Sequence, residues 1–261
     1  MMRSLNTAAT GMVAQQYNLD VISNNLANVN TNAYKQQRAE FQDLMYQTFR
    51  ASGAADGSST TPQPVQVGLG SRFSATATNF SRGALSATGN PLDIAINGEG
   101  FFAVEKPDGT TAYTRDGAFK KDANGLLVTS DGYPVSPNIT IPPTATAISI
   151  SPAGVVNATV DGSNETQTLG QINVVIFPNP AGLTHLGQNL YGAGGGSGDP
   201  QTLVPGQGGA GVLQSEFLEG SNVSVVDEMV KMILAQRSYE INSKAIQTAD
   251  DMLGLVANLK R

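Results

Sequence analysis

The side chains that could perform acid–base or nucleophilic chemistry are few in this chain. His185 is the single histidine, within "GLTHLGQ", and the sequence contains no cysteine. Thiolate nucleophiles, disulfides and zinc sites built from Cys and His are therefore excluded. A lone histidine acting as a general base needs an oriented partner, and the residues around His185 offer none. We interpret His185 as a surface or packing residue.

Three short motifs resemble ligand-binding sequences but lack the context that such sites require. Gly206 to Gly211, "GQGGAG", fits the spacing G-x-G-x-x-G, yet the strand-like "VLQSEF" follows it in place of a phosphate-binding helix. Asp122 to Gly125 resembles the start of a calcium loop, but no acidic residue follows at the required distance. The acidic pairs at 227–228 and 250–251 fall on a predicted helix, where capping and solvation explain them. The sequence predicts no catalytic residue, no cofactor and no metal.

Length and composition limit the remaining classes of function. The 261 residues, 40% of them hydrophobic, suffice for one large or two modest domains with a sizeable core. A net charge of −6 without a cluster of Lys and Arg argues against nucleic acid as a partner. No run of about 18 apolar residues is present, so we expect no membrane insertion. The N-terminus lacks the apolar core of a signal peptide, and any export is expected to proceed without a cleaved signal.

Apolar residues at three-four spacing predict a long helix at each end of the chain. The first stripe begins at Leu5 and continues to Val29, and the second runs from Val230 to Leu259. We expect the second helix to extend from about Ser224 to Asn258, with Ser224 as N-cap and Asp227 at the third helical position. Such spacing is typical of a coiled-coil-like layer.

The first helix is unusually poor in charge, which indicates an interface between subunits. From Ser4 to Tyr34 the only charged side chain is Asp20, whereas an outward face normally carries several. On the second helix further apolar residues lie outside the stripe, at Val226, Met229, Met232 and Ile233. The alternative is a purely intramolecular helix pair. The predicted subunit-interface residues are Leu5, Met12, Leu19, Ile22, Asn24, Asn25, Leu26, Asn28, Asn30, Tyr34, Val230, Leu234, Ile241, Ala245, Met252, Leu255 and Leu259.

Asparagines are concentrated where the first helix should end. "NVNTNAYK", residues 28–35, terminates the helical pattern, because Asn bonds nearby backbone groups and favours caps and turns. We expect the amides of Asn24, Asn25 and Asn28 to pair with neighbouring chains, since uncharged donors and acceptors are buried at less cost than ions. A simple helix C-cap is the alternative.

The middle of the chain predicts antiparallel β structure. "FQDLMYQTFR" is expected to be helical or extended to about Arg50, and residues 51–64 form a loop or extended arm before strand character resumes. Five Asn-Gly or Asp-Gly pairs between 97 and 132 indicate successive hairpins. The predicted fold class is therefore α+β. Its expected parts are an N-terminal helix at 1–35, a linker and arm at 36–84, a β domain at 85–215 and a C-terminal helix at 216–261.

Five stretches together resemble the flagellar rod and hook family of axial proteins, and most closely its distal-rod type. They are "NNLANVNTNAYK", "LDIAINGEGFFAV", "YTRDGAF", "ITIP" and "MILAQRSYEINSKAIQTADDML", in the order of the family and over nearly the whole chain. The resemblance implies a structural subunit that is not an enzyme and polymerises into a hollow helical drive shaft across the periplasm. It also implies terminal helices in the inner layers of the tube and export unfolded through the flagellar apparatus. The implied partners are proximal-rod and hook subunits and the bushing rings in the peptidoglycan and outer membrane.

Two further expectations follow from this resemblance. The segment Tyr46 to Val67 would be the arm that distinguishes the distal-rod type from the hook type. The family usually has Gly where this chain has Ala33, and we predict that the turn here avoids a left-handed backbone, which is costly for Ala. The alternatives are a proximal-rod or hook subunit of the same family, or a secreted β-domain binding module, which the absence of Trp disfavours.

Overall fold

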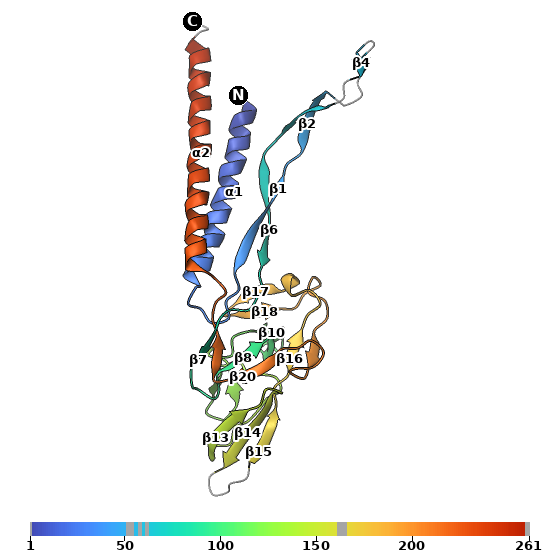
Figure 1. Cartoon of the computed structure of the whole chain (residues 1–261), viewed down its shortest axis with the longest axis vertical. Coiled ribbons are helices and arrows are strands. Elements are labelled where there is room, and N and C mark those ends of the chain that lie inside the picture. The colour runs from blue at the N-terminus through green and yellow to red at the C-terminus, as the bar shows by residue number, and fades with distance from the viewer. Residues whose placement is uncertain (1, 51–54, 57–58, 61–62, 161–165, 259–261) are drawn as a thin grey trace. The chain divides into compact units, whose positions relative to one another are not determined.

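The computed structural model describes residues 2–50, 55–56, 59–60, 63–160 and 166–258 and divides the chain into two compact units (Figure 1). Unit 1 comprises Met1–Ala27, Gln37–Ala77 and Ser224–Arg261, and unit 2 comprises Asn28–Gln36 and Thr78–Val223. The chain thus passes between the units four times. Leu259 of the predicted interface lies outside the described residues.

Unit 1 contains both long helices, and they run antiparallel. Helix α1 spans Met2–Ala27 and α2 spans Val225–Asn258. The end of α1 meets the start of α2 where Asn25 Nδ2 donates to Glu228 Oε2 at 3.0 Å, and the middle of α1 meets α2 where Gly11 faces Asn242. The predicted N-cap is confirmed, because the backbone N–H of Asp227 donates to Ser224 Oγ at 3.4 Å.

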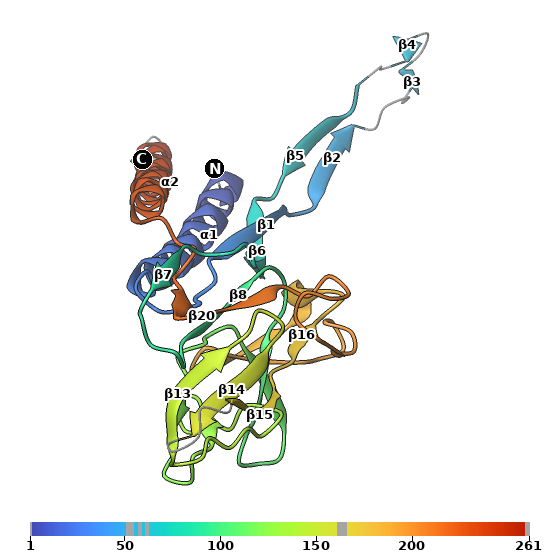
Figure 2. The same cartoon turned by 60° about the horizontal axis from the view of Figure 1, so that its bottom comes forward.

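The rest of unit 1 is a narrow antiparallel ribbon rather than a continuation of α1. Its strands are β1 (Gln37–Asp43), β2 (Tyr46–Arg50), β3 (Ala55–Asp56), β4 (Ser59–Thr60), β5 (Val65–Gly68) and β6 (Ser71–Thr78). They pair as β1–β6, β2–β5 and β3–β4, so the chain runs outward along β1, β2 and β3 and returns along β4, β5 and β6 (Figure 2). Of the two states expected for "FQDLMYQTFR", the extended one is present.

Unit 2 consists of short strands in several small sheets. They are β7 (Leu85–Ala87), β8 (Ile94–Asn97), β9 (Phe102–Glu105), β10 (Thr111–Thr114), β11 (Lys120–Lys121), β12 (Leu127–Val128), β13 (Ala145–Ile150), β14 (Val155–Val160), β15 (Thr166–Gln171), β16 (Val174–Ile176), β17 (Thr184–Gly187), β18 (Leu190–Gly192), β19 (Gln201–Leu203), β20 (Val212–Ser215) and β21 (Phe217–Glu219). The largest sheets have the orders β17-β18-β10-β9 and β13-β14-β15, and each pair is antiparallel. A 3-10 turn, Pro180–Gly182, precedes β17.

The predicted hairpins are present in part. Turns at Asp108-Gly109 and Asn124-Gly125 join the paired strands β9–β10 and β11–β12. The expected hairpin at Asn97-Gly98 is absent: β8 pairs instead with β20, more than a hundred residues away, with Ile96 opposite Leu213. A Cβ on Gly98 would lie 2.6 Å from the Cα of Gly211, so this glycine allows two backbones to approach closely, and its φ is 134°.

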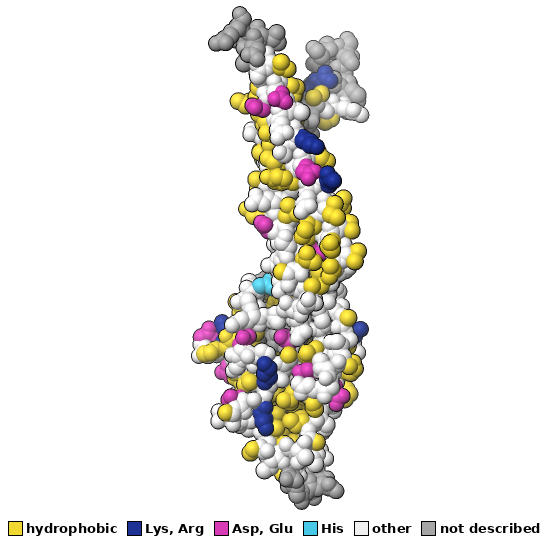
Figure 3. All heavy atoms as spheres, turned by 90° about the vertical axis from the view of Figure 1, so that its left-hand side faces the viewer, with side chains coloured by type: hydrophobic (Ala, Val, Ile, Leu, Met, Phe, Trp, Pro, Cys, Tyr) yellow, Lys and Arg dark blue, Asp and Glu magenta, His cyan; other side chains and the backbone are white. Residues whose placement is uncertain are grey.

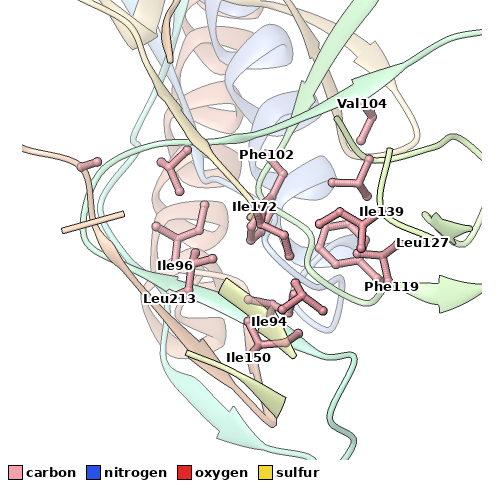
Figure 4. Packing of buried hydrophobic residues seen from close by; sticks show 14 of the residues in the cluster. Ile94, Ile96, Phe102, Val104, Phe119, Leu127, Ile139, Ile150, Ile172 and Leu213 are labelled. Atoms are coloured by element: carbon pink, nitrogen blue, oxygen red, sulfur yellow. The ribbon is translucent and has the colours of Figure 1, made fainter. Parts of the chain in front are cut away.

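The core of unit 2 is formed by aliphatic and aromatic side chains from strands distant in sequence. Figure 4 shows Ile94 and Ile96 of β8 with Phe102, Phe119 and Leu213, all buried. A second, aromatic cluster joins residues including Phe101, Tyr113 and Tyr191. Burying one such side chain contributes about 1.5–3 kcal/mol, so these clusters account for the cohesion of many short strands.

Candidate assembly interface

Helix α2 exposes a row of large apolar side chains. Six lie within ten residues at its start, and Figure 3 shows hydrophobic side chains gathered over the helices of unit 1. These six are Val225, Val226, Met229, Val230, Ile233 and Leu234. Further along α2, Ile241, Met252 and Leu255 are also exposed. Contiguous exposed apolar surface of this kind marks an interaction site, because isolated hydrophobic residues are common but rows of them are not.

The exposed row is not the face of α2 that contacts α1. The α1-facing positions recur every seven residues, at Glu228, Ala235, Asn242 and Ala249, and their side chains are buried or half-buried. The residues predicted for the interface on α2 lie on another face. All of those within the described side chains are exposed: Val230, Leu234, Ile241, Ala245, Met252 and Leu255.

The predicted positions on the N-terminal side are placed differently. In α1, Ile22 is buried and Asn24 is exposed, and the half-buried positions are Leu5, Met12, Leu19 and Leu26. Unit 2 contains the remaining three, of which Asn30 is exposed and Asn28 and Tyr34 are half-buried. The predicted set is therefore divided between exposed surface and intrachain packing.

Asn25 has a role within the chain. Its side chain is 1% exposed, and its amide nitrogen donates to Gln37 O at 2.8 Å as well as to Glu228. Its amide oxygen accepts the backbone N–H of Gln37 at 2.9 Å. Glu228 in turn binds Lys231 Nζ at 2.6 Å. Asn25 therefore joins the end of α1, the start of β1 and the start of α2, where we had expected a bond to a neighbouring chain.

A groove lies between α1 and the ribbon of unit 1. It has a volume of about 590 Å³ and is lined on one side by Ala9, Thr10, Val13, Ala14 and Tyr17 and on the other by Leu44, Ser71, Arg72 and Phe73. Tyr17 stacks on Phe73 with ring centroids 5.0 Å apart, which fixes one end of the groove. Arg72 is the single charged residue in this lining, and its Nη2 donates to Gln42 at 3.0 Å.

Unit 2 contains a buried ionic cluster that the sequence reasoning missed. Glu219 accepts Lys35 Nζ at 2.7 Å, Arg115 Nε at 2.9 Å and the N–H of Gly83 at 2.9 Å. The side chains of Lys35 and Glu219 are both 0% exposed. Lys35 also donates to Ser81 O at 2.8 Å. The cluster therefore joins the segment after α1, the segment after β6 and the segment before α2.

The charges of this cluster shift one another's ionisation. Burial alone would raise the pKa of Glu219, but the charges of Arg115 and Lys35 and the hydrogen bonds outweigh it and hold that pKa below its ordinary value. Burial, reinforced by Arg115, lowers the pKa of Lys35 despite the opposing attraction of Glu219. Arg115 further donates to three backbone carbonyls, those of Ile96, Gly98 and Gly100.

The backbone of Ala33, close to this cluster, contradicts its prediction. The φ of Ala33 is 56°, so the turn is left-handed and the prediction was wrong. Ala33 is buried, and its backbone N–H donates to the carbonyl oxygen of Glu219 at 2.8 Å. A left-handed alanine costs about 1–2 kcal/mol, which this tertiary hydrogen bond and the surrounding packing offset.

The residues considered above as candidates for catalysis or ligand binding make structural contacts. His185 Nε2 lies 3.0 Å from Thr78 Oγ1, its ring lies 5.0 Å from that of Tyr191, and burial lowers its pKa. Residues 206–211 form a tight turn between β19 and β20. Within the described part of the chain no group of three or more His, Asp or Glu is arranged to hold a metal ion. None of the described helices is long and apolar enough to cross a membrane.

Three family profiles match the chain. "Flagella basal body rod protein" matches residues 5–35, which include most of α1. "Flagellar hook protein FlgE/F/G D1 domain" matches residues 95–158 in unit 2. "Flagellar basal body rod FlgEFG protein C-terminal" matches residues 214–259, which include α2.

Relatives from several bacteria are similar to the chain over its length. The flagellar basal-body rod protein FlgG of Borreliella burgdorferi is 52% identical over 264 residues, covering 100% of both sequences. That of Agrobacterium fabrum is 48% identical, covering 99% of this chain and 100% of the relative. That of Bacillus subtilis is 44% identical, covering 100% of both. The similarity therefore extends across both helices and the β unit.

Proposed function

Because the chain belongs to the family of flagellar basal-body rod proteins FlgG, we propose that it forms the distal part of the flagellar rod. In this role it is a structural subunit that polymerises into a helical shaft and transmits torque across the periplasm to the hook. The observation that carries the proposal is the identity of 44–52% over essentially the full length of three relatives with the same name.

The exposed apolar row of α2 would be the main contact between subunits. Val230, Leu234 and Ile241 are spaced by four and seven residues and lie on a face that α1 does not cover. Burial of one such side chain contributes about 1.5–3 kcal/mol, so a few repeated contacts per subunit would stabilise a polymer. The half-buried residues Leu5, Met12 and Leu19 of α1 would extend this interface, whereas Ile22 and Asn25 would support it from within unit 1. We propose the same helices as a coiled-coil-like inner layer of the shaft.

The further partners follow from the same role. A distal-rod subunit would contact the proximal rod at one end and the hook at the other, with bushing rings around it. We also propose export through the flagellar apparatus without a cleaved signal, and a function of residues 46–67 as the arm of the distal-rod type. The names of the relatives favour a rod subunit over a hook subunit, and the full-length match disfavours a secreted binding module.

Electron cryotomography of motors in a strain that lacks this gene tests the proposal. We expect a shaft that stops short of the outer membrane and carries no hook. A complete rod that lacks only its hook would instead indicate that the protein is a hook subunit, one segment further from the cell. Motors of unchanged length and composition would contradict a role in the rod.

A charge placed in the proposed interface tests the assignment of α2. Ile241 is 66% exposed, so Ile241→Asp should leave the isolated subunit folded but abolish assembly, because the carboxylate would be buried without a partner between subunits. Gln247→Asp is the matched control, since Gln247 is also exposed on the same helix but is polar and is not one of the proposed interface residues. Swimming and hook formation should be lost in the first strain and retained in the second. Normal assembly of both variants would contradict the assignment of this face of α2 to the interface.

A further inference from the structure

The groove of unit 1, which lies between α1 on one side and Leu44 and the start of β6 on the other, is open in the single chain. Its volume of about 590 Å³ lies within the range of roughly 300–1,000 Å³ that binding pockets span. Val13 at its centre is 52% exposed, and Tyr17 and Phe41 beside it are also exposed. A monomer with this surface leaves several apolar side chains in water that a partner could cover.

The helix α2 of the same chain does not fill this groove. It contacts α1 along the face that contains Gly11 and Asn25, as shown by the approach of Asn242 and the bond to Glu228. Val13 is two residues from Gly11 and therefore points to the opposite side of α1. Among the described residues, the groove is therefore left open.

We propose that the groove receives the first turns of α2 from a second copy of this chain. Rod assembly, on which this inference rests, brings many copies together at high local concentration. The apolar row at the start of α2 presents Val226, Val230 and Ile233 at spacings of four and three, the pattern by which a helix anchors in a groove.

The dimensions of the two surfaces agree. The groove follows α1 from Ala9 to Tyr17, about 12 Å at 1.5 Å per residue, and the anchors from Val226 to Ile233 span about 11 Å. Beyond the first apolar stretch of α2, the exposed ion pair of Arg237 with Glu240, at 3.0 Å, separates these anchors from the exposed apolar side chains that resume at Ile241. The stretch that contains the three anchors is therefore about as long as the groove that would receive it.

The charges at the edges of the two surfaces are complementary. Arg72 is the charged residue of the groove lining and is exposed. Asp227 is exposed beside Val226 and Val230 at the start of α2. Placing these opposite charges side by side would set the register of the contact and reject a shifted one, since like or unpaired charges are unfavourable there.

The proposed contact also explains why assembly would produce a filament. The groove and the apolar segment of α2 are different surfaces of one chain, so each copy would present its own α2 to the next copy and its own groove to the one before. A contact of this heterologous type continues indefinitely unless its rotation closes a ring. A contact of α2 with α2 would instead join copies in closed pairs.

Disulfide cross-linking tests the contact cleanly, because the chain has no cysteine of its own. Val13 lies at the middle of the groove and Val230 at the middle of the anchors, so the two meet whichever direction the incoming helix runs. Val13→Cys and Val230→Cys chains with tags of different size would be co-expressed in place of the native gene, and their basal bodies oxidised. We expect a mixed dimer of the two tagged chains. The control pair is Val13→Cys with Gln247→Cys, which should give no mixed dimer.

Three results would overturn the contact. Swimming cells whose rods give no mixed dimer would exclude it while leaving the function in the rod intact, since a failure of that function appears separately in the motors of the deletion strain. Cross-linking of Val230→Cys chains to one another in place of the mixed dimer would indicate contact between two α2 helices. Equal cross-linking of the control pair would show that the reaction does not depend on this geometry.

Charge reversal provides a second measurement that does not depend on cysteine. Arg72→Glu and Asp227→Arg should each lower the rate of colony expansion in soft agar by about tenfold or more. Each substitution places two like charges together at the contact. The double variant restores opposite charges and should swim nearly as the native strain does. Both side chains are exposed, so the fold of the subunit should not change. A double variant that is no better than the worse single variant would contradict this register.

Discussion

We predict that Glu219 contributes more to the stability of unit 2 than any charged side chain on the surface of that unit. Glu219→Gln keeps the shape of the side chain but leaves Lys35 and Arg115 without their shared anion. Arg115 retains three backbone carbonyls as acceptors, whereas Lys35 retains the carbonyl of Ser81. Breaking a buried ion pair in this way costs about 3–5 kcal/mol, against a total of about 5–15 kcal/mol for a typical domain.

Urea unfolding at pH 7 measures this loss. The sequence has no Trp, so near-UV circular dichroism of the buried Tyr113 and Tyr191 is the suitable signal for unit 2. With a slope of about 2 kcal/mol per molar urea, the expected loss lowers the unfolding midpoint by about 2 M. Glu216→Gln is the matched control, because Glu216 is three residues away and exposed, and it should shift the midpoint by less than about 0.3 M.

The dependence on pH provides an internal check. The pKa of Glu219 is lower in the folded chain, so its contribution is present above the unfolded carboxyl pKa of about 4.3 and is lost as pH falls through the folded value. The native chain and Glu219→Gln should therefore converge in stability as the solution becomes more acidic. A Glu219→Gln midpoint equal to that of Glu216→Gln at pH 7 would refute the reasoning, as would a difference that stays constant into acid.

Two further predictions concern unit 2. Gly100→Ala should destabilise unit 2 by about 3 kcal/mol, because the new Cβ would lie 2.0 Å from Val174 Cγ1 at a φ of 128°. Gly109→Ala, at a φ of 76° and with open space around the new Cβ, should cost only about 1 kcal/mol. Urea unfolding midpoints of the two variants measure this difference, and equal losses would contradict the packing argument. Burial raises the pKa of Tyr191, so this side chain ionises first in the unfolded chain and stability falls as pH rises past about 10. Tyr191→Phe should reduce this alkaline loss of stability. Thermal midpoints that fall equally in the native chain and the variant above this pH would contradict the prediction.

The sequence predicted those features that depend on neighbouring residues. The three-four spacing and the Ser224 cap located α2 within a residue, because helix periodicity and capping are local. The hairpins at Asp108-Gly109 and Asn124-Gly125 were predicted for the same reason, since a turn is encoded by the residues within it. The motifs that resemble the rod and hook family are also contiguous stretches of residues, so they indicated the family without any knowledge of tertiary contacts.

Features that join distant segments could not be predicted in this way. Lys35 and Glu219 are 184 residues apart, and nothing in either local sequence indicates that they form an ion pair. The left-handed turn at Ala33 was predicted wrongly because local cost disfavours it, whereas its hydrogen bond to the backbone of Glu219 is tertiary. The pairing of β8 with β20 likewise replaced an expected hairpin.

The two faces of α2 separate what sequence and structure each decided. The sequence determined that α2 is a helix with more apolar surface than one partner can cover. Only the tertiary structure decided which face meets α1, and it is the less apolar one, with Ala235, Ala249 and the polar Glu228 and Asn242. Small side chains let two helices approach closely, and the Asn25–Glu228 bond fixes their ends. The larger apolar side chains therefore remain on the outside of the chain.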